Sequence, residues 1–162
     1  MTFRDDLALQ LLADAVQFGP VEGWRLNIHD EYPDAPRSPF YIDLRPSIRS
    51  VPSFRRQLGE CISDLIGRGE LRLDCISDVP QAGTPLVTTV SDLTGIPMIS
   101  PRLEGKRHGT GREIHGIYEP GLRVAIIDDL RTTGGSMRRA AEVHQRHGLE
   151  VVAYLAVIDR SG

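Results

Sequence analysis

The chain lacks the features that mark secreted, membrane-bound and nucleic-acid-binding proteins. Its 162 residues include only two cysteines, Cys61 and Cys75, which form neither a Cys-x-x-Cys pair nor a zinc-binding pattern. No apolar stretch approaches the length of a membrane-spanning helix, and the first residues, Met-Thr-Phe-Arg-Asp-Asp, lack the apolar core of a signal peptide. The net charge of -3 argues against a general nucleic-acid surface. These absences favour a cytoplasmic protein with reduced thiols.

What the sequence does contain suits one compact α/β domain. It is 40% hydrophobic and 25% charged, with no internal repeat or low-complexity tract. The spacing of apolar residues predicts helices over 3–18, 53–66, 85–93 and 136–147, and strands over 40–44, 74–79, 97–100, 123–127 and 151–158. Segment 24–37 is expected to be a loop or frayed hairpin, and segment 102–120 a long mobile loop or hairpin. The alternation of strands with helices predicts a mainly parallel sheet with helices on its faces.

The most informative stretch runs from Val124 to Ser136, with the sequence Val-Ala-Ile-Ile-Asp-Asp-Leu-Arg-Thr-Thr-Gly-Gly-Ser. Its apolar start predicts a strand that is covered on both faces. Asp128 and Asp129 follow at the carboxyl end, where open α/β sheets bind their ligands. The glycine- and hydroxyl-rich turn then leads into a helix, whose N-terminus and backbone N–H groups attract an anion.

This turn predicts a phosphate site made by Thr132, Thr133, Gly134, Gly135 and Ser136. The carboxylates cannot favour a bare phosphate, so we expect them to accept hydrogen bonds from sugar hydroxyls or to help hold a hydrated Mg²⁺. Two adjacent acids alone are more often just a polar strand end, but the complete turn favours a sugar phosphate. The stretch is neither a Walker loop nor a Gly-x-Gly-x-x-Gly dinucleotide motif.

Segment 102–120 is the second candidate site, because it combines cations with glycines. The cations are Arg102, Lys106, Arg107, His108 and Arg112. A flexible cationic segment suits a lid that closes over a diphosphate and excludes water. A solvated loop without a function is the alternative that its charges alone leave open.

The Val124–Ser136 stretch resembles the phosphoribosyl-pyrophosphate (PRPP) motif of the type I phosphoribosyltransferases. The resemblance implies that the acidic pair binds the ribose hydroxyls and that the turn holds the 5-phosphate. Arg131 departs from the pattern, because the family usually has an aliphatic residue there. The run from Arg102 to Gly116 resembles the catalytic loop of orotate phosphoribosyltransferases, which reaches into the neighbouring subunit. Its matching residues are Arg102, Lys106 and His108.

Three shorter segments resemble the same family. The first segment is Ser38-Pro-Phe-Tyr-Ile-Asp-Leu-Arg45, and its resemblance implies that Phe40 and Tyr41 lie near the pyrimidine ring. Asp78-Val-Pro-Gln-Ala-Gly-Thr-Pro85 resembles the loop that receives pyrophosphate through backbone N–H groups, at Gln81, Ala82 and Gly83. Val157-Ile-Asp-Arg-Ser-Gly162 implies that Arg160 helps bind the orotate carboxylate, for which an arginine fork is well suited. Taken alone, these segments are equally compatible with core packing, an ordinary turn and a surface arginine.

Several positions depart from the family pattern. Three expected cations are missing, at Asn27, Ala82 and Leu103, and Arg37 is a candidate to replace one of them. The chain also carries an acidic insert, Asp30–Asp34, which would reshape the base pocket if the substrate is not orotate.

The resemblance implies a type I phosphoribosyltransferase fold as a single domain over 1–162. An N-terminal hood segment would cover about 1–45, and a mobile catalytic loop about 101–120. It also implies Mg²⁺-dependent transfer of phosphoribosyl from PRPP to orotate, giving orotidine 5'-monophosphate and diphosphate. The expected catalytic residues are Arg102, Lys106, His108 and Asp129. Mg²⁺ would be held mainly by PRPP and water, near Asp128 and Asp129.

The expected partners are PRPP and a nucleobase, in a homodimer with shared active sites and with no nucleic acid or membrane partner. Three alternatives remain open from the sequence. One is a phosphoribosyltransferase for another nucleobase. The second is a non-catalytic PRPP-binding or regulatory protein, and the third is a structural partner of another enzyme.

Overall fold

The structure is a computed structural model that describes residue 13 and residues 15–26, 28–69, 71–103 and 112–160. Backbone contacts divide the chain into two compact units, Met1–Ser50 and Val51–Gly162. The sequence-based expectation of one domain with an N-terminal segment over about 1–45 stays a prediction. Within the described residues, no helix combines the length and the apolar character that a membrane crossing needs.

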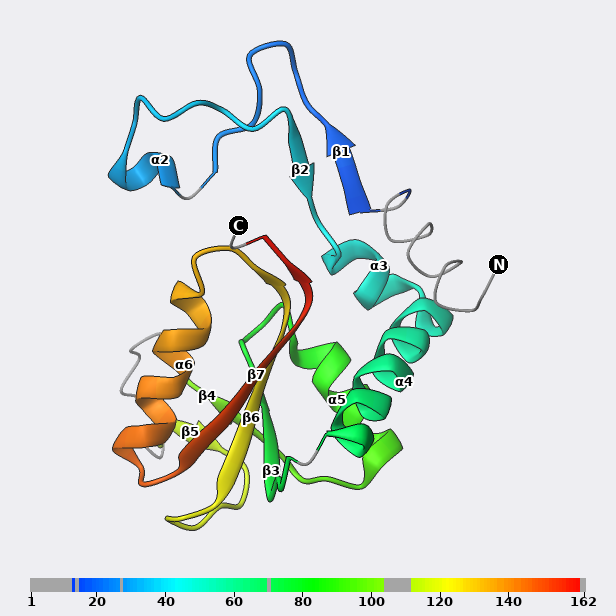
Figure 1. Cartoon of the computed structure of the whole chain (residues 1–162), viewed down its shortest axis with the longest axis vertical. Coiled ribbons are helices and arrows are strands. Elements are labelled where there is room, and N and C mark those ends of the chain that lie inside the picture. The colour runs from blue at the N-terminus through cyan, green and yellow to red at the C-terminus, as the bar shows by residue number, and fades with distance from the viewer. Residues whose placement is uncertain (1–12, 14, 27, 70, 104–111, 161–162) are drawn as a thin grey trace. The chain divides into compact units, whose positions relative to one another are not determined.

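The N-terminal unit is built on a two-stranded antiparallel ribbon (Figure 1). Strand β1 (Val16–Phe18) pairs with β2 (Phe40–Ile42), with Phe18 opposite Phe40. The predicted helix over 3–18 is therefore wrong at its end, because residues 16–18 form ladder hydrogen bonds with a distant strand; residues 3–12 and 14 lie outside the described residues. Helix α3 (Arg45–Ser50), which the apolar spacing did not predict, follows β2.

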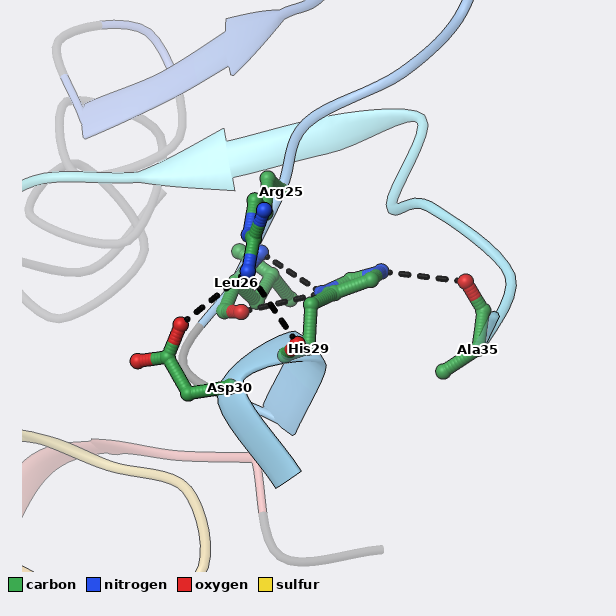
Figure 2. Close-up of polar contacts among 5 residues, drawn as sticks. All are labelled: Arg25, Leu26, His29, Asp30 and Ala35. Carbon is green, nitrogen blue, oxygen red and sulfur yellow. Dashed lines mark hydrogen bonds and ion pairs between the residues drawn. The ribbon is translucent and has the colours of Figure 1, made fainter. Parts of the chain in front are cut away.

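The segment between these strands is organised around a buried histidine (Figure 2). Helix α2 (Ile28–Glu31) contains His29, whose side chain is 2% exposed. The Leu26 N–H lies 2.9 Å from His29 Nδ1, and His29 Nε2 lies 3.1 Å from the Ala35 carbonyl oxygen. Arg25 donates to the His29 carbonyl and forms an ion pair with Asp30. The expected loop over 24–37 thus contains a helical turn and a defined hydrogen-bond network.

The C-terminal unit contains a five-stranded sheet in the order β5-β4-β3-β6-β7. Its strands are β3 (Cys75–Asp78), β4 (Met98–Pro101), β5 (Ile114–His115), β6 (Arg123–Arg131) and β7 (Glu150–Asp159). Strands β4, β3, β6 and β7 are parallel, and only the short edge strand β5 is antiparallel to its neighbour. The predicted α/β fold with a mainly parallel sheet is confirmed.

Helices cover both faces of this sheet (Figure 1). Helices α4 (Pro52–Arg68) and α5 (Thr84–Thr94) pack together on one side, and α6 (Gly135–Arg146) lies on the other. Proline stands in the first turn of α4 and of α5, where its missing N–H costs nothing. Gly95, with φ of 71°, ends α5 in the left-handed conformation that favours glycine. The predicted helices over 53–66, 85–93 and 136–147 are confirmed.

Strand β6 is longer than the predicted strand over 123–127, and this difference affects the site. Its ladder with β7 continues from Asp128 opposite Ala156 to Arg131 opposite Asp159. Every residue from Val124 to Asp129 is buried. The acidic pair therefore lies within the strand rather than after it, because backbone pairing with β7 extends beyond the apolar run.

Candidate active site

The carboxyl ends of three neighbouring strands form one edge of the C-terminal sheet. Asp78, the last residue of β3, is in register with Ile127 of β6, and Arg131 of β6 is in register with Asp159 of β7. Because these strands are parallel, the segments that follow them start at the same edge. The segments are the 79–83 loop, the 132–134 turn and Arg160.

The acidic pair predicted from the sequence is buried at this edge. Asp128 and Asp129 are 5% and 7% exposed. The Asp129 N–H donates to Asp128 Oδ1 at 2.9 Å, and the Leu130 N–H donates to Asp129 Oδ1 at 3.0 Å. Burial raises the pKa of Asp128 to about 8, and the side chain of Asp129, through a hydrogen bond and its charge, and the charge of Asp78 act in the same direction, while the Asp129 N–H acts against it. A poorly hydrated acidic pair of this kind suits a ligand that brings hydroxyl donors or a divalent cation.

Asp78 is a third acid of the site, and its role was missed from the sequence. Its side chain is fully buried. One carboxylate oxygen accepts a hydrogen bond from the Ser100 hydroxyl at 2.5 Å, and the other accepts one from the Thr84 hydroxyl. These bonds tie the end of β3 to the end of β4 and to the first turn of α5. In the sequence, Asp78 lies near the end of the predicted strand over 74–79 and begins the segment that resembles the pyrophosphate loop, but neither feature predicted its contacts with Ser100 and Thr84.

The loop from Val79 to Gly83 lies against strand β6. The Gly83 N–H donates to the Val79 carbonyl at 3.1 Å. A β-carbon placed on Gly83 would lie 3.1 Å from the Ile127 carbonyl oxygen, so glycine allows this close approach. The other two candidate residues of this loop differ in exposure, since Gln81 is exposed and Ala82 is half-buried. The loop is thus held beside the strand that carries the acidic pair.

The phosphate turn occupies the junction of β6 and α6. Gly134 precedes the helix with φ of 73°, in the left-handed region that favours glycine. The side chains of Thr132 and Thr133 are exposed, and Ser136 Oγ accepts a hydrogen bond from Arg139 at 3.2 Å. Because Gly135 begins α6, the N-terminal N–H groups of the helix are in the turn itself, and this arrangement suits an anion.

The other predicted site residues are placed less completely. Arg160 follows β7, and its N–H donates to the Arg131 carbonyl at 2.8 Å, next to the phosphate turn. The Arg102 N–H donates to the Glu113 carbonyl at 2.8 Å, just before residues 104–111. Lys106, His108 and Asn27 lie outside the described residues.

Phe40 and Tyr41 belong to strand β2 of the N-terminal unit. The Tyr41 ring packs against Trp24 with 5.5 Å between ring centroids, and its hydroxyl accepts a hydrogen bond from Arg45 at 3.1 Å. Arg45 is also fixed by Asp43, with 2.6 Å between Nε and Oδ1. These contacts give the Tyr41 side chain a defined position within its unit.

A buried histidine lies next to the acidic cluster and was also missed from the sequence. His144 of α6 is fully buried, and its Nε2 lies 2.7 Å from the hydroxyl of Ser77, the neighbour of Asp78. Its Nδ1 has no hydrogen-bond partner among the described groups. Burial, followed by the charge of His147, lowers the pKa of His144 to about 4. The neutral ring therefore supports the end of β3 from the α6 side.

The described residues include no group of three or more His, Cys, Asp or Glu side chains that could hold a metal by themselves. The buried Asp128–Asp129 pair offers hard carboxylate oxygens, as Mg²⁺ prefers. The site therefore fits Mg²⁺ only if substrate oxygens and water supply its other ligands.

The chain is similar to known protein sequences and to solved structures, but no protein-family model matches it. The orotate phosphoribosyltransferase of Caenorhabditis elegans is 39% identical over 123 residues, which are 76% of this chain and 54% of that protein. That of Pyrococcus abyssi is 34% identical over 123 residues, which are 76% of this chain and 67% of that protein. The chain thus spans about half the length of the nematode protein.

The solved structures agree with these relatives. The structure of Leishmania donovani UMP synthase superposes with a TM-score of 0.78 and 31% sequence identity, over 98% of this chain and 32% of that one.

Proposed function

Since the chain belongs to the orotate phosphoribosyltransferase family, we propose that it transfers the phosphoribosyl group of PRPP to orotate, giving orotidine 5'-monophosphate and diphosphate. One structural observation carries the proposal. The buried Asp128–Asp129 pair is followed within the same strand and turn by an anion site at the N-terminus of α6. A ribose 5-phosphate has hydroxyls for the first feature and a phosphate for the second.

In the proposed reaction, a ring nitrogen of orotate attacks C1 of the ribose while the bond from C1 to the diphosphate oxygen breaks. The bonding electron pair leaves with the diphosphate, positive charge develops on the ribose, and the attacking ring nitrogen releases its proton to solvent. Asp128 and Asp129 accept hydrogen bonds from the ribose hydroxyls and offset this charge. Preorganised electrostatics of this kind is often the largest contribution to catalysis.

Protonation of the acidic pair is part of this proposal. With its pKa raised to about 8, Asp128 keeps a proton in the free protein at neutral pH. Binding of ribose hydroxyls and a nearby cation favours the ionised carboxylate, so the proton is released when PRPP binds. Mg²⁺ bound with PRPP would neutralise the diphosphate, and Asp128 and Asp129 are the residues that would contact its water shell.

The remaining residues have proposed roles at the two ends of PRPP. The 132–136 turn anchors the 5-phosphate, and the backbone N–H groups of residues 81–83 receive the diphosphate. Arg160 binds the orotate carboxylate, with Phe40 and Tyr41 near the ring. Arg102, Lys106 and His108 stabilise the leaving diphosphate from a loop that is shared between the subunits of a homodimer. Cys61 and Cys75 form no disulfide, which supports a cytoplasmic location.

The test is a spectroscopic assay of orotate consumption with PRPP and Mg²⁺, with and without EDTA. We expect turnover with Mg²⁺ and its loss with EDTA. Parallel reactions with uracil, adenine and hypoxanthine test the base. Turnover of one of these bases without turnover of orotate would refute the substrate, and binding of PRPP without turnover of any base would refute the enzyme activity.

A further inference from the structure

The start of helix α6 carries more positive charge than a helix N-terminus favours. Arg138 lies at the end of its first turn, Arg139 follows directly, Arg131 ends the preceding strand, and the first turn has no acidic residue. The N-terminus of a helix is the positive end of its dipole, so cations there destabilise the helix. A bound anion offsets this repulsion. The arginines therefore need an explanation beyond helix stability.

Arg131 is held over the phosphate turn. Its Nη1 forms an ion pair with Asp159 Oδ2 of β7 at 3.0 Å. Its Nε lies 3.5 Å from the position that a β-carbon on Gly134 would occupy. The guanidinium is thus fixed between the end of β7 and the glycine that precedes α6.

Arg138 approaches the same turn from the helix. Its Nη1 donates to the Thr133 carbonyl at 2.7 Å. The same nitrogen lies 3.6 Å from a β-carbon position on Gly134, and Nη2 lies 3.9 Å from that on Gly135. Arg131 and Arg138 therefore converge on one short backbone segment, Gly134–Gly135, whose N–H groups are the expected phosphate donors.

We propose that Arg131 and Arg138 bind the 5-phosphate of PRPP as a guanidinium pair, in addition to the N–H groups of the turn. The inference rests on the proposed function, because it assigns further residues to the 5-phosphate end of the same site. A guanidinium has more N–H donors than its single contact with Asp159 or Thr133 uses, and its planar fork matches phosphate oxygens. A phosphate dianion also neutralises the cations that the helix dipole disfavours.

The Arg131–Arg138 pair places positive charge at the 5-phosphate end of the site. Ala82 and Leu103 provide no cation at the diphosphate end, whereas Arg131 and Arg138 provide two at the 5-phosphate end. Ribose 5-phosphate alone, which has only the 5-phosphate end of the substrate, should therefore bind measurably to the full chain.

The experiment measures calorimetric binding of two separate ligands, ribose 5-phosphate and magnesium pyrophosphate. Arg131→Leu and Arg138→Leu should each weaken ribose 5-phosphate binding about tenfold, the loss expected for a charge-assisted hydrogen bond, and leave pyrophosphate binding within about twofold of wild type. Arg146→Leu is the matched control: it removes the same charge from the other end of α6, where Arg146 pairs with Glu113, and should change neither affinity.

Unchanged ribose 5-phosphate affinity in both arginine variants, or no binding of this ligand to the wild type, would overturn the inference. Since Arg138 is exposed on the helix surface, its variant provides a test even if Arg131→Leu does not fold. The outcome is separate from that of the proposed function. If the wild type does not turn over orotate but the arginine variants still bind ribose 5-phosphate more weakly than the wild type, the proposed function is refuted and the arginine pair is supported.

Discussion

Replacing Asp128 with asparagine should stabilise the protein, and increasingly so as the pH rises. The raised pKa of Asp128, about 8 against an ordinary value of 3.8, means that the folded protein keeps a proton that the unfolded chain loses above about pH 4. The contribution of Asp128 therefore becomes less favourable as the pH rises from about 4 to about 8, and above that the folded protein carries a buried charge at this position. Asparagine keeps the shape and an oxygen that accepts the Asp129 N–H, without the charge.

The size of the effect follows from the shift. At about 1.4 kcal/mol per pH unit, a shift of roughly four units sets a ceiling of about 6 kcal/mol. Because Asp129 shares the charge and water can relax around the pair, we expect Asp128→Asn to gain about 2–4 kcal/mol at about pH 9 and little at about pH 4. The same variant should raise the KM for PRPP, since it weakens binding of the ribose hydroxyls.

Urea unfolding followed by circular dichroism at several pH values measures this gain. Asp74→Asn is the control, because its effect on stability should depend on pH in the opposite direction. Hydrogen bonds from Arg123 lower the pKa of Asp74, so its contribution to stability is present near neutral pH and is lost in acid. A gain for Asp128→Asn that does not depend on pH, or a loss at about pH 9, would refute the assignment of a buried, proton-retaining carboxyl.

Two further substitutions test the surroundings of the site. His144 should contribute a loss of up to about 3 kcal/mol as the pH falls from about 6.5 to about 4, because the folded protein keeps its ring neutral while the unfolded chain protonates it. Urea unfolding of His144→Gln should therefore show a smaller loss than the wild type over this range, and an identical pH dependence would contradict the prediction. Gly134→Ala should cost about 1 kcal/mol because of its φ of 73° and should raise the KM for PRPP. Gly95→Ala, with φ of 71° in open space, should cost the same stability and leave that KM unchanged; equal effects on KM would contradict a role of Gly134 in phosphate binding.

Much of the C-terminal unit could be predicted because its signals are local. Helices α4, α5 and α6 follow apolar spacing between prolines and glycines, and strand β3 follows a short apolar run. The phosphate turn was predictable for the same reason, since all its residues are consecutive.

The features that were missed depend on distant pairing. Val16–Phe18 continues an apolar helical stripe in the sequence, but it pairs with residues 40–42 as a strand. Strand β6 runs through its acids to Arg131 because β7 continues beside it. The contact of Ser77 with His144 joins residues 67 positions apart, which no spacing pattern reveals.

The most direct test of the account is to quantify the products of a reaction that contains the chain, PRPP, orotate and Mg²⁺. Chromatography with mass spectrometry should find orotidine 5'-monophosphate and diphosphate in equal amounts, because each transfer releases one of each. Diphosphate with ribose 5-phosphate and no orotidine 5'-monophosphate would show hydrolysis of PRPP instead, and unreacted PRPP and orotate would show that the site binds without catalysis. Either result would contradict the proposed transfer.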